Sequence, residues 1–205
     1  MPDLFHESHW RAQGFIRIAG LDEAGRGPLA GPVSAAAVVL PEDYEHPVLN
    51  DSKQVSEKRR EALYEEITSD PRIVWASAVV ESDEIDRINI LRATHLAMAR
   101  AFSKLSTAPD LALIDGRPVK NFPGEHRALV KGDSLSLSIA AASIIAKVER
   151  DRLMLGYAHR YPEYGFERHK GYGTAAHLKA LNSHGPCLIH RRSFAPVAQS
   201  KLKRK

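Results

Sequence analysis

The chain has 205 residues, 43% of them hydrophobic and 26% charged, so it is long enough for one globular domain and too apolar to be wholly disordered. Its single cysteine, Cys187, excludes an intramolecular disulfide and a cysteine-rich zinc site, which favours a reducing, cytoplasmic location. No apolar run approaches the roughly 18 residues of a membrane helix, and the first residues lack the apolar stretch of a signal peptide.

The net charge of +4 arises at the C-terminus. Four of the 29 basic residues are Lys201, Lys203, Arg204 and Lys205, and the 25 that remain balance the 25 acidic residues. A field over the whole protein is therefore no reason to expect a nucleic-acid ligand. The end of the chain is expected to form a solvated basic tail, with non-specific attraction to phosphates as the alternative.

Three apolar, partly β-branched runs in the first 80 residues predict strands. They cover residues 15–21, 32–40 and 72–80. A turn rich in glycine and proline joins the first two, which predicts an antiparallel pair. Between the second and third strands, a helix is expected over residues 56–67, with Ser56 as its N-cap.

The second half of the chain alternates helix and strand. Apolar residues at helical spacing predict a helix over residues 89–105, followed by a buried strand at 110–114 and a weaker strand at 127–130. Residues 135–148 are apolar on nearly every face, which indicates a buried helix, and the charged continuation at 149–152 is expected to emerge into solvent. A short helix is predicted at 174–183 among loops.

This order of elements predicts an α/β domain with a mixed sheet and a helical C-terminal extension. The expected organisation is an N-terminal extension over residues 1–14, a main domain over 15–198 that is helical from about residue 155, and the basic tail over 199–205.

Four carboxylates stand at the ends of predicted elements. Asp22 and Glu23 end the first strand, Asp115 ends a later strand, and Asp133 comes just before the buried helix. If these strands are neighbours, the four acids converge on one edge of the sheet, where their mutual repulsion requires protons or metal ions. Oxygen ligands suit Mg²⁺ or Mn²⁺, and two such ions could promote phosphodiester hydrolysis.

Each acid also has a simpler interpretation. Asp115 followed by glycine is a common turn, Asp133 could cap the helix that follows it, and the pair Asp22 and Glu23 could be exposed before a loop. Adjacent strand residues point to opposite faces. Asp22 and Glu23 therefore face one ion only if the chain turns at Glu23, and otherwise they would bind from different sides.

A glycine-rich loop follows the two acids. Gly25, Gly27 and Gly31 form a G-x-G-x-x-x-G pattern, which would suit a dinucleotide-dependent oxidoreductase. Prolines and a β-branched run follow the loop where a phosphate-binding loop would open a helix, and the preceding acids would repel a pyrophosphate. The alternative use of the glycines is close approach of the backbone to a ligand such as a ribose 2′-hydroxyl.

Six motifs in order resemble the ribonuclease HII family, the type 2 ribonucleases H, over roughly residues 17–197. They are IAGLDEAGRGPLAGPV (18–33), NDSKQVSEKRRE (50–61), LALIDG (111–116), KGDSLSLSIAAASIIAKVERDR (131–152), HKGYGT (169–174) and IHRRSFAPV (189–197).

The resemblance implies a ribonuclease H-like fold, a five-stranded mixed sheet flanked by helices. It also implies endonucleolytic cleavage of the RNA strand of RNA–DNA hybrids and of single ribonucleotides embedded in duplex DNA, the step that starts ribonucleotide excision repair. The products would carry 3′-hydroxyl and 5′-phosphate ends. Asp22, Glu23, Asp115 and Asp133 match the family's catalytic acids, which hold Mn²⁺ or Mg²⁺, as a two-ion site.

The same resemblance assigns the substrate contacts. Gly25, Arg26 and Gly27 match the element that reads the 2′-hydroxyl and the nearby phosphate through the backbone, and Tyr172 matches a tyrosine that stacks at the junction sugar. Ser52 and Lys53 lie in a segment near substrate phosphates, where Gln54 and Val55 replace the Lys-Leu of many relatives. A monomer is expected. A non-catalytic hybrid-binding protein stays open as an alternative.

The sequence His190-Arg191-Arg192 is interpreted as a solvated turn, with contact to a DNA backbone as the alternative. None of the ten histidines shows a close metal-binding spacing, so each is expected to be a surface or core residue.

Overall fold

The structure of the chain, a computed structural model, describes residues 1–46, 49 and 55–202. A five-stranded sheet in the order β3-β2-β1-β4-β5 forms its centre. The strands are β1 (Ile18–Ala24), β2 (Val33–Val39), β3 (Val74–Val80), β4 (Leu111–Asp115) and β5 (His126–Leu129). Strand β2 runs antiparallel to both β1 and β3, whereas β4 runs parallel to β1 and β5. The predicted mixed sheet and its antiparallel first pair are therefore confirmed.

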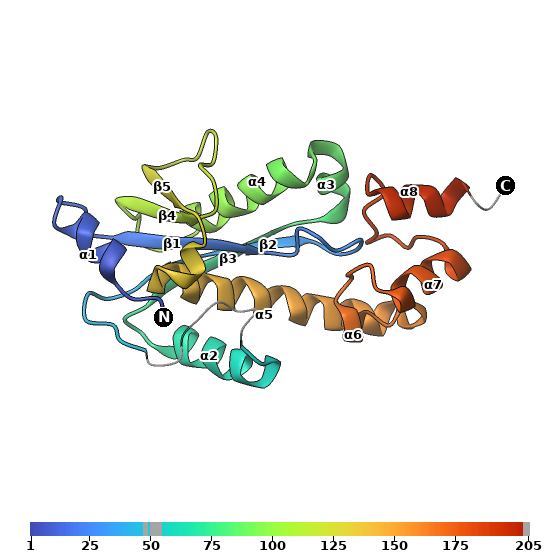
Figure 1. Ribbon diagram of the computed structural model, residues 1–205, viewed down its shortest axis with the longest axis horizontal. Coiled ribbons are helices and arrows are strands. Elements are labelled where there is room, and N and C mark those ends of the chain that lie inside the picture. Colours follow the sequence, from blue (N-terminus) through green and yellow to red (C-terminus); the bar gives the residue numbers. More distant parts are fainter. Residues whose placement is uncertain (47–48, 50–54, 203–205) are drawn as a thin grey trace.

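Helices cover both faces of the sheet (Figure 1). They are α1 (Phe5–Arg11), α2 (Glu57–Ser69), α3 (Ser82–Ile88), α4 (Ile90–Ser103), α5 (Leu137–Arg160), α6 (Phe166–His169), α7 (Ala175–His184) and α8 (Ala195–Leu202), with 3₁₀ turns η1 (Gly132–Ser134) and η2 (Pro162–Tyr164). In Figure 1, α3 and α4 lie on one side of the sheet and α2 and α5 on the other. Helices α6, α7 and α8 gather at the end of the molecule opposite α1.

Small side chains on β2 bring both helical layers close to the sheet. Ala35 and Ala37 belong to the core cluster shared with α4, whereas Ala36 and Val38 belong to the cluster shared with α5 and α2. The alternation follows from the two-residue repeat of a strand. Because both faces of β2 are apolar, this strand reads as one continuous hydrophobic run.

Helix α5 approaches β1 most closely at Gly20. A Cβ atom on this residue would overlap the backbone of Ser138 and Ile139, well inside the 3.0 Å that real Cβ atoms keep. Glycine is therefore the residue that allows the buried helix to lie directly on the central strand.

Two boundaries differ from the prediction in ways that matter for function. Strand β1 begins at Ile18 and continues through Ala24, since its pairing with β2 extends as far as Ala24 opposite Ser34. The acids predicted to end this strand therefore lie inside it. Helix α5 continues to Arg160, and the expectation that residues 149–152 emerge into solvent is wrong for Arg150 and Asp151, which are both buried.

The first residues form a helix that contacts the start of α5. Glu7 of α1 is fully buried, and its Oε1 atom accepts hydrogen bonds from Ser136 Oγ at 2.6 Å, Ser138 Oγ at 2.5 Å and Ser138 N at 3.0 Å. Residues 1–14, expected as an extension, thus contribute a buried carboxylate to the N-terminal end of α5.

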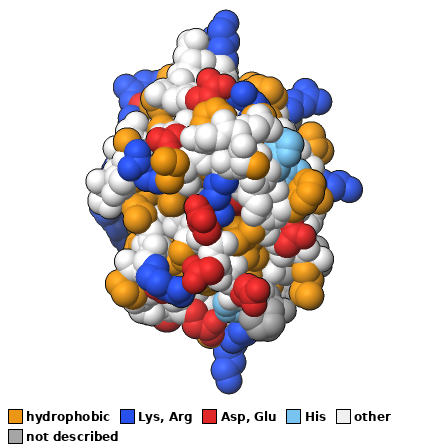
Figure 2. Space-filling view, turned by 90° about the vertical axis from the view of Figure 1, so that its left-hand side faces the viewer, with side chains coloured by type: hydrophobic (Ala, Val, Ile, Leu, Met, Phe, Trp, Pro, Cys, Tyr) orange, Lys and Arg blue, Asp and Glu red, His pale blue; other side chains and the backbone are white. Residues whose placement is uncertain are grey.

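The surface carries both signs of charge. Figure 2 views the end of the molecule that carries α1, and on it acidic side chains lie among basic and hydrophobic ones without a broad basic face. This mixture agrees with the formally neutral body of the chain. Within the residues that the structure describes, every helix is too short or too polar to cross a membrane.

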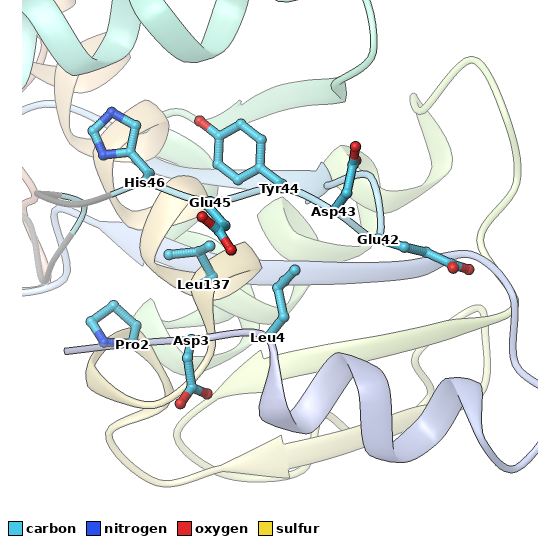
Figure 3. Close-up of a pocket in the computed structure, with 9 residues that line it drawn as sticks. All are labelled: Pro2, Asp3, Leu4, Glu42, Asp43, Tyr44, Glu45, His46 and Leu137. Atoms are coloured by element: carbon cyan, nitrogen blue, oxygen red, sulfur yellow. The ribbon is translucent and has the colours of Figure 1, made fainter.

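A hollow of about 490 Å³ lies between the N-terminal segment and the loop after β2 (Figure 3). Its lining includes Asp3, Glu42, Asp43 and Glu45, and the carboxylates of Asp3 and Glu42 point in different directions in Figure 3. None of the predicted site residues that the structure describes lines it. It is therefore separate from the candidate site.

Candidate active site

The predicted acids meet where β1 and β4 lie side by side. Asp22 and Glu23 lie near the end of β1, just before its last residue Ala24, and Asp115 is the last residue of β4, which runs parallel to β1. The chain does not turn at Glu23, so the two side chains of β1 leave opposite faces of the sheet. Asp22 is buried toward α5 beside Ser143, whereas the carboxylate of Glu23 is 3.2 Å from the guanidinium of Arg26.

Asp22 lies in an environment that disfavours its negative charge. Burial, and then the neighbouring carboxylates of Glu23 and Asp115, raise the pKa of Asp22 well above its usual value. Hydrogen bonds from the Glu23 amide, at 2.7 Å, and from the Ser143 side chain oppose this rise. Three carboxylates thus interact electrostatically at one sheet edge, which is the convergence that the sequence predicts.

The fourth acid approaches from the turn before α5. The amide of Gly132 donates a hydrogen bond of 2.7 Å to Asp115 Oδ1, which attaches η1 to the end of β4. Asp133 is the next residue and is buried, with 7% of its surface exposed. Asp115 therefore does more than close a turn, and the four acids lie on three segments that the fold brings to the same edge.

The donor chemistry fits a hard divalent cation, although the side chains do not form a finished coordination shell. Among residues 1–46, 49 and 55–202, no three His, Cys, Asp or Glu side chains stand in positions that would hold a metal ion as they are. The repulsion at Asp22 is the feature that a cation would relieve, because opposite charge favours the ionised carboxylate.

The predicted substrate-binding loop borders one of the four acids, Glu23. A cleft of about 230 Å³ is lined by Glu23, Ala24, Gly25, Arg26, Gly27, Ser143, Lys147 and Tyr172. Tyr172 is 44% exposed, and its ring faces Gly27. A second cleft of about 510 Å³ lies on the α4 side and shares Glu23 and Arg26 with the first. Ser52 and Lys53 lie outside the described residues.

The loop does not bind a dinucleotide in the manner of a Rossmann fold. After Gly31 the chain enters β2, so no helix N-terminus points at the loop. The oxidoreductase interpretation of the glycine pattern is therefore wrong.

Sequence reasoning missed two residues of the cleft. Ser143 and Lys147 stand one turn apart on α5, and the ammonium of Lys147 donates to Asp151 Oδ1 at 2.6 Å. Burial lowers the pKa of Lys147. The sequence did contain a signal for these residues. Lys147 is the first charged residue of a helix that is largely apolar up to that point, and it lies one turn after Ser143.

His190 and Arg191 are buried, which contradicts their interpretation as a solvated turn, and only Arg192 is exposed. His190 Nε2 lies 3.0 Å from His177 Nε2, and His177 Nδ1 lies 2.9 Å from the carbonyl of Tyr172. The ring of His177 also stacks on that of His169. These histidines form a buried network that holds the loop carrying Tyr172.

This network is expected to make the protein less stable in acid. Burial, followed by the nearby His177, lowers the pKa of His190 to about 3. An unfolded imidazole binds its proton near pH 6.5, so the stabilising contribution of neutral His190 is complete above that pH and is lost as the pH falls toward 3. Between pH 6.5 and 5 the loss is about 2 kcal/mol.

Urea unfolding at pH 7 and pH 5 checks this expectation. His190→Gln should show a smaller drop in unfolding free energy between the two pH values than the unsubstituted protein. His159→Gln, at an exposed position of α5, is the control and should retain the full drop. An equal drop in all three proteins would contradict the assignment.

Comparison with known proteins agrees with these features. The ribonuclease HII family profile matches residues 19–197. Ribonuclease HII of Endomicrobium trichonymphae is 56% identical over 195 residues, covering 93% of this chain and 92% of its own. That of Listeria monocytogenes is 52% identical over 197 residues, covering 96% and 75%.

Solved structures support the same fold. The crystal structure of ribonuclease H2 from Pyrococcus horikoshii superposes with a TM-score of 0.78 at 25% identity, covering 93% of this chain and all of that one. RNase HII from Archaeoglobus fulgidus, solved in complex with PCNA, gives 0.70 at 26% identity over 86% and 94%. Bst-RNase HIII in complex with Mn²⁺ shares the fold, with a TM-score of 0.68 at 19% identity over 93% and 70%. The chain therefore belongs to the ribonuclease HII family and is a ribonuclease H, a hydrolase that cleaves the RNA strand of RNA–DNA hybrids.

Proposed function

We propose that the enzyme also cleaves at single ribonucleotides embedded in duplex DNA, by metal-dependent in-line attack of water that leaves 3′-hydroxyl and 5′-phosphate ends. The observation that carries the proposal is the shared cleft. Glu23, whose carboxylate interacts with that of Asp22, lines this cleft together with the glycine-rich loop Gly25–Gly27 and the exposed ring of Tyr172. A single ribose would fit between Glu23 and the loop, so recognition would not require a long RNA segment.

Asp22, Glu23, Asp115 and Asp133 would hold Mg²⁺ or Mn²⁺ ions. When bound, a pair of divalent ions lowers the pKa of the attacking water and stabilises charge on the leaving oxygen. The protein's own contribution is to hold these carboxylates close together and to offset part of the cost of an ionised Asp22. The hydrogen bonds that the Glu23 amide and Ser143 donate to Asp22 serve this purpose.

The remaining side chains of the cleft would select the substrate. Backbone groups of Gly25, Arg26 and Gly27 would bind the 2′-hydroxyl and the adjacent phosphate, and the ring of Tyr172 would stack on the sugar at the RNA–DNA junction. Ser52 and Lys53, which lie outside the described residues, would contact substrate phosphates. The protein would act as a monomer, with residues 15–198 as the catalytic unit.

The test offers the purified protein a DNA duplex with one ribonucleotide, an RNA–DNA hybrid and an all-DNA duplex, each with Mn²⁺, Mg²⁺ or EDTA. We expect cleavage of the first two substrates only, dependent on metal, at one phosphodiester bond beside the single ribonucleotide. Mapping the product ends checks the chemistry. Cleavage of the hybrid without cleavage of the single-ribonucleotide duplex would refute the finer proposal, and binding without turnover would favour a non-catalytic hybrid-binding protein.

A further inference from the structure

Arg191 is a fully buried arginine that donates its hydrogen bonds to the glycine-rich loop between β1 and β2. Its Nη2 donates to the carbonyl of Gly25 at 2.6 Å and its Nη1 to that of Arg26 at 2.9 Å. Nε and Nη2 also donate to the carbonyls of Gly31 and Pro32, at 2.9 and 3.1 Å. One guanidinium thus binds both ends of the segment that joins β1 to β2.

Arg150 of α5 supports the same segment from beneath. It is 1% exposed and donates to the carbonyls of Pro32 at 3.0 Å, Ala30 at 3.2 Å and Lys170 at 3.0 Å. The contact with Lys170 joins the loop to the segment that carries Tyr172, whose ring centre lies 6.0 Å from the Arg150 guanidinium.

The contact between Arg150 and the loop is close enough to dictate the sequence at Gly25. This residue has a φ of +95°, and a Cβ atom there would overlap Nε and Cδ of Arg150. Glycine at this position therefore accommodates both the left-handed backbone and the arginine packed against it.

Both guanidinium groups lack an acidic partner. In the part of the chain that the structure describes, neither arginine has a carboxylate within the 4.0 Å of an ion pair, and carbonyl dipoles are their only hydrogen-bond acceptors. Burial and the neighbouring Arg150 lower the pKa of Arg191 to about 9, so it remains charged at neutral pH. Two positive charges are thus buried side by side, which costs free energy unless a negative group compensates.

The loop offers such a group a place to bind. The amides of Gly25, Arg26 and Gly27 donate no hydrogen bond to any group within residues 1–46, 49 and 55–202, while the carbonyls of Gly25 and Arg26 are occupied by Arg191. With its carbonyls held on one side, the loop keeps unoccupied N–H donors for a ligand.

We infer that Arg150 and Arg191 are positioning residues for ribonucleotide recognition. They fix the carbonyl side of the Gly25–Gly27 loop and add positive potential behind its amides, where the ribose phosphate binds. The inference rests on the proposed function, since it explains how the loop is prepared to read a ribonucleotide. The buried network of His177 and His190 reinforces it by holding the Tyr172 segment next to the same loop.

The test separates recognition from folding. Arg191→Lys and Arg150→Lys keep the charge but remove the forked set of donors. For the duplex with one ribonucleotide, we expect KM to rise about tenfold, because each variant loses hydrogen bonds to a charged group. The inhibition constant of an all-DNA duplex of the same sequence should stay unchanged. Arg100→Lys is the control, because Arg100 makes a similar forked contact with Glu84 on the exposed surface of α4.

The outcomes distinguish a failure of the proposed function from a failure of the role assigned to the two arginines. If the unsubstituted enzyme fails to cleave the ribonucleotide duplex, the proposed function fails. If it cleaves while the folded lysine variants keep both constants, or lose affinity for both duplexes equally, only the role of the arginines is overturned. A melting temperature that falls without a change in the ratio of the two constants would likewise indicate a structural role alone.

A measurement on the unsubstituted protein covers the case in which the variants do not fold. With ¹⁵N-labelled arginine and EDTA to prevent cleavage, two slowly exchanging Nε–H signals are expected from the buried arginines. They should shift when the ribonucleotide duplex binds and shift less with the all-DNA duplex. Equal shifts with both duplexes would overturn the inference.

Discussion

Replacing Asp22 by asparagine is expected to abolish cleavage and to stabilise the metal-free protein. The variant keeps the size of the side chain but removes a charge needed to hold divalent ions. Activity should therefore fall by about 10³-fold or more, as expected when several kcal/mol of transition-state stabilisation are lost. Stability should rise because the ionised carboxylate is buried beside Glu23 and Asp115. Cleavage rates with Mn²⁺ and Mg²⁺, and thermal melting in EDTA, check the two expectations.

The pH dependence of the unfolding free energy provides an independent test that Asp22→Asn stabilises the protein. Because the folded state raises the pKa of Asp22, its contribution to stability is full below the unfolded value near 3.9 and is lost as the pH rises through the folded value. The stabilisation by Asp22→Asn should therefore be larger at pH 7 than at pH 4.

Asp110, at the other end of β4, provides a matched control of opposite sign. It accepts hydrogen bonds from the amides of Arg17 and Ile16, and the first of these is the largest cause of its lowered pKa. Asp110→Asn should therefore lower stability at pH 7 and leave cleavage intact. An Asp22→Asn variant that cleaved normally, or that melted lower than the unsubstituted protein in EDTA, would contradict the role assigned to Asp22.

Periodicity and turn chemistry predict most of the layers of this fold. The N-caps Ser56 and Thr174 stand where the sequence places the starts of two helices, and both side chains accept from the third residue of the helix. The all-round apolar segment before residue 149 is the buried helix α5. Local signals suffice here because each depends on residues a few positions apart.

The missed elements lack such signals or depend on distant contacts. Helix α3 is a short polar segment, and Asn89, with a φ of +68°, separates it from α4. The apolar periodicity of α4 therefore does not extend back into α3. The burial of Arg150 and Arg191 follows from contacts with the segment between β1 and β2, and for Arg150 also with Lys170 after α6. No pattern within a single segment reports those contacts.

In the candidate site, too, some features have local sequence signals and others depend on distant contacts. Four acids and a glycine loop are visible in the sequence because their residue types are chemically distinctive. That Asp22 and Glu23 leave opposite faces of a continuous strand depends on how far β1 pairs with β2, which the sequence does not reveal. The arginines that hold the loop appear only in three dimensions, since 41 positions separate Arg150 from Arg191.

Gly20→Ala is expected to be the most damaging conservative change in the sheet. The added methyl group would overlap the backbone of Ser138 and Ile139, and backbone cannot rotate away as a flexible side chain can. Helix α5 would have to move off β1, at a cost of about 3 kcal/mol or more. The movement would also displace Ser143 from Asp22, so cleavage should fall together with the melting temperature.

Gly156→Ala is the matched control on the same helix. A Cβ atom at Gly156 meets nothing within 4 Å, so alanine should stabilise the helix by about 0.5–1 kcal/mol through its higher helix propensity and leave cleavage unchanged. Urea unfolding of both variants measures the contrast. Unfolding of Gly20→Ala at the same urea concentration as the unsubstituted protein would contradict this prediction. The close contact between α5 and β1 would then not be the reason that Ser143 lies next to the buried carboxylate of Asp22.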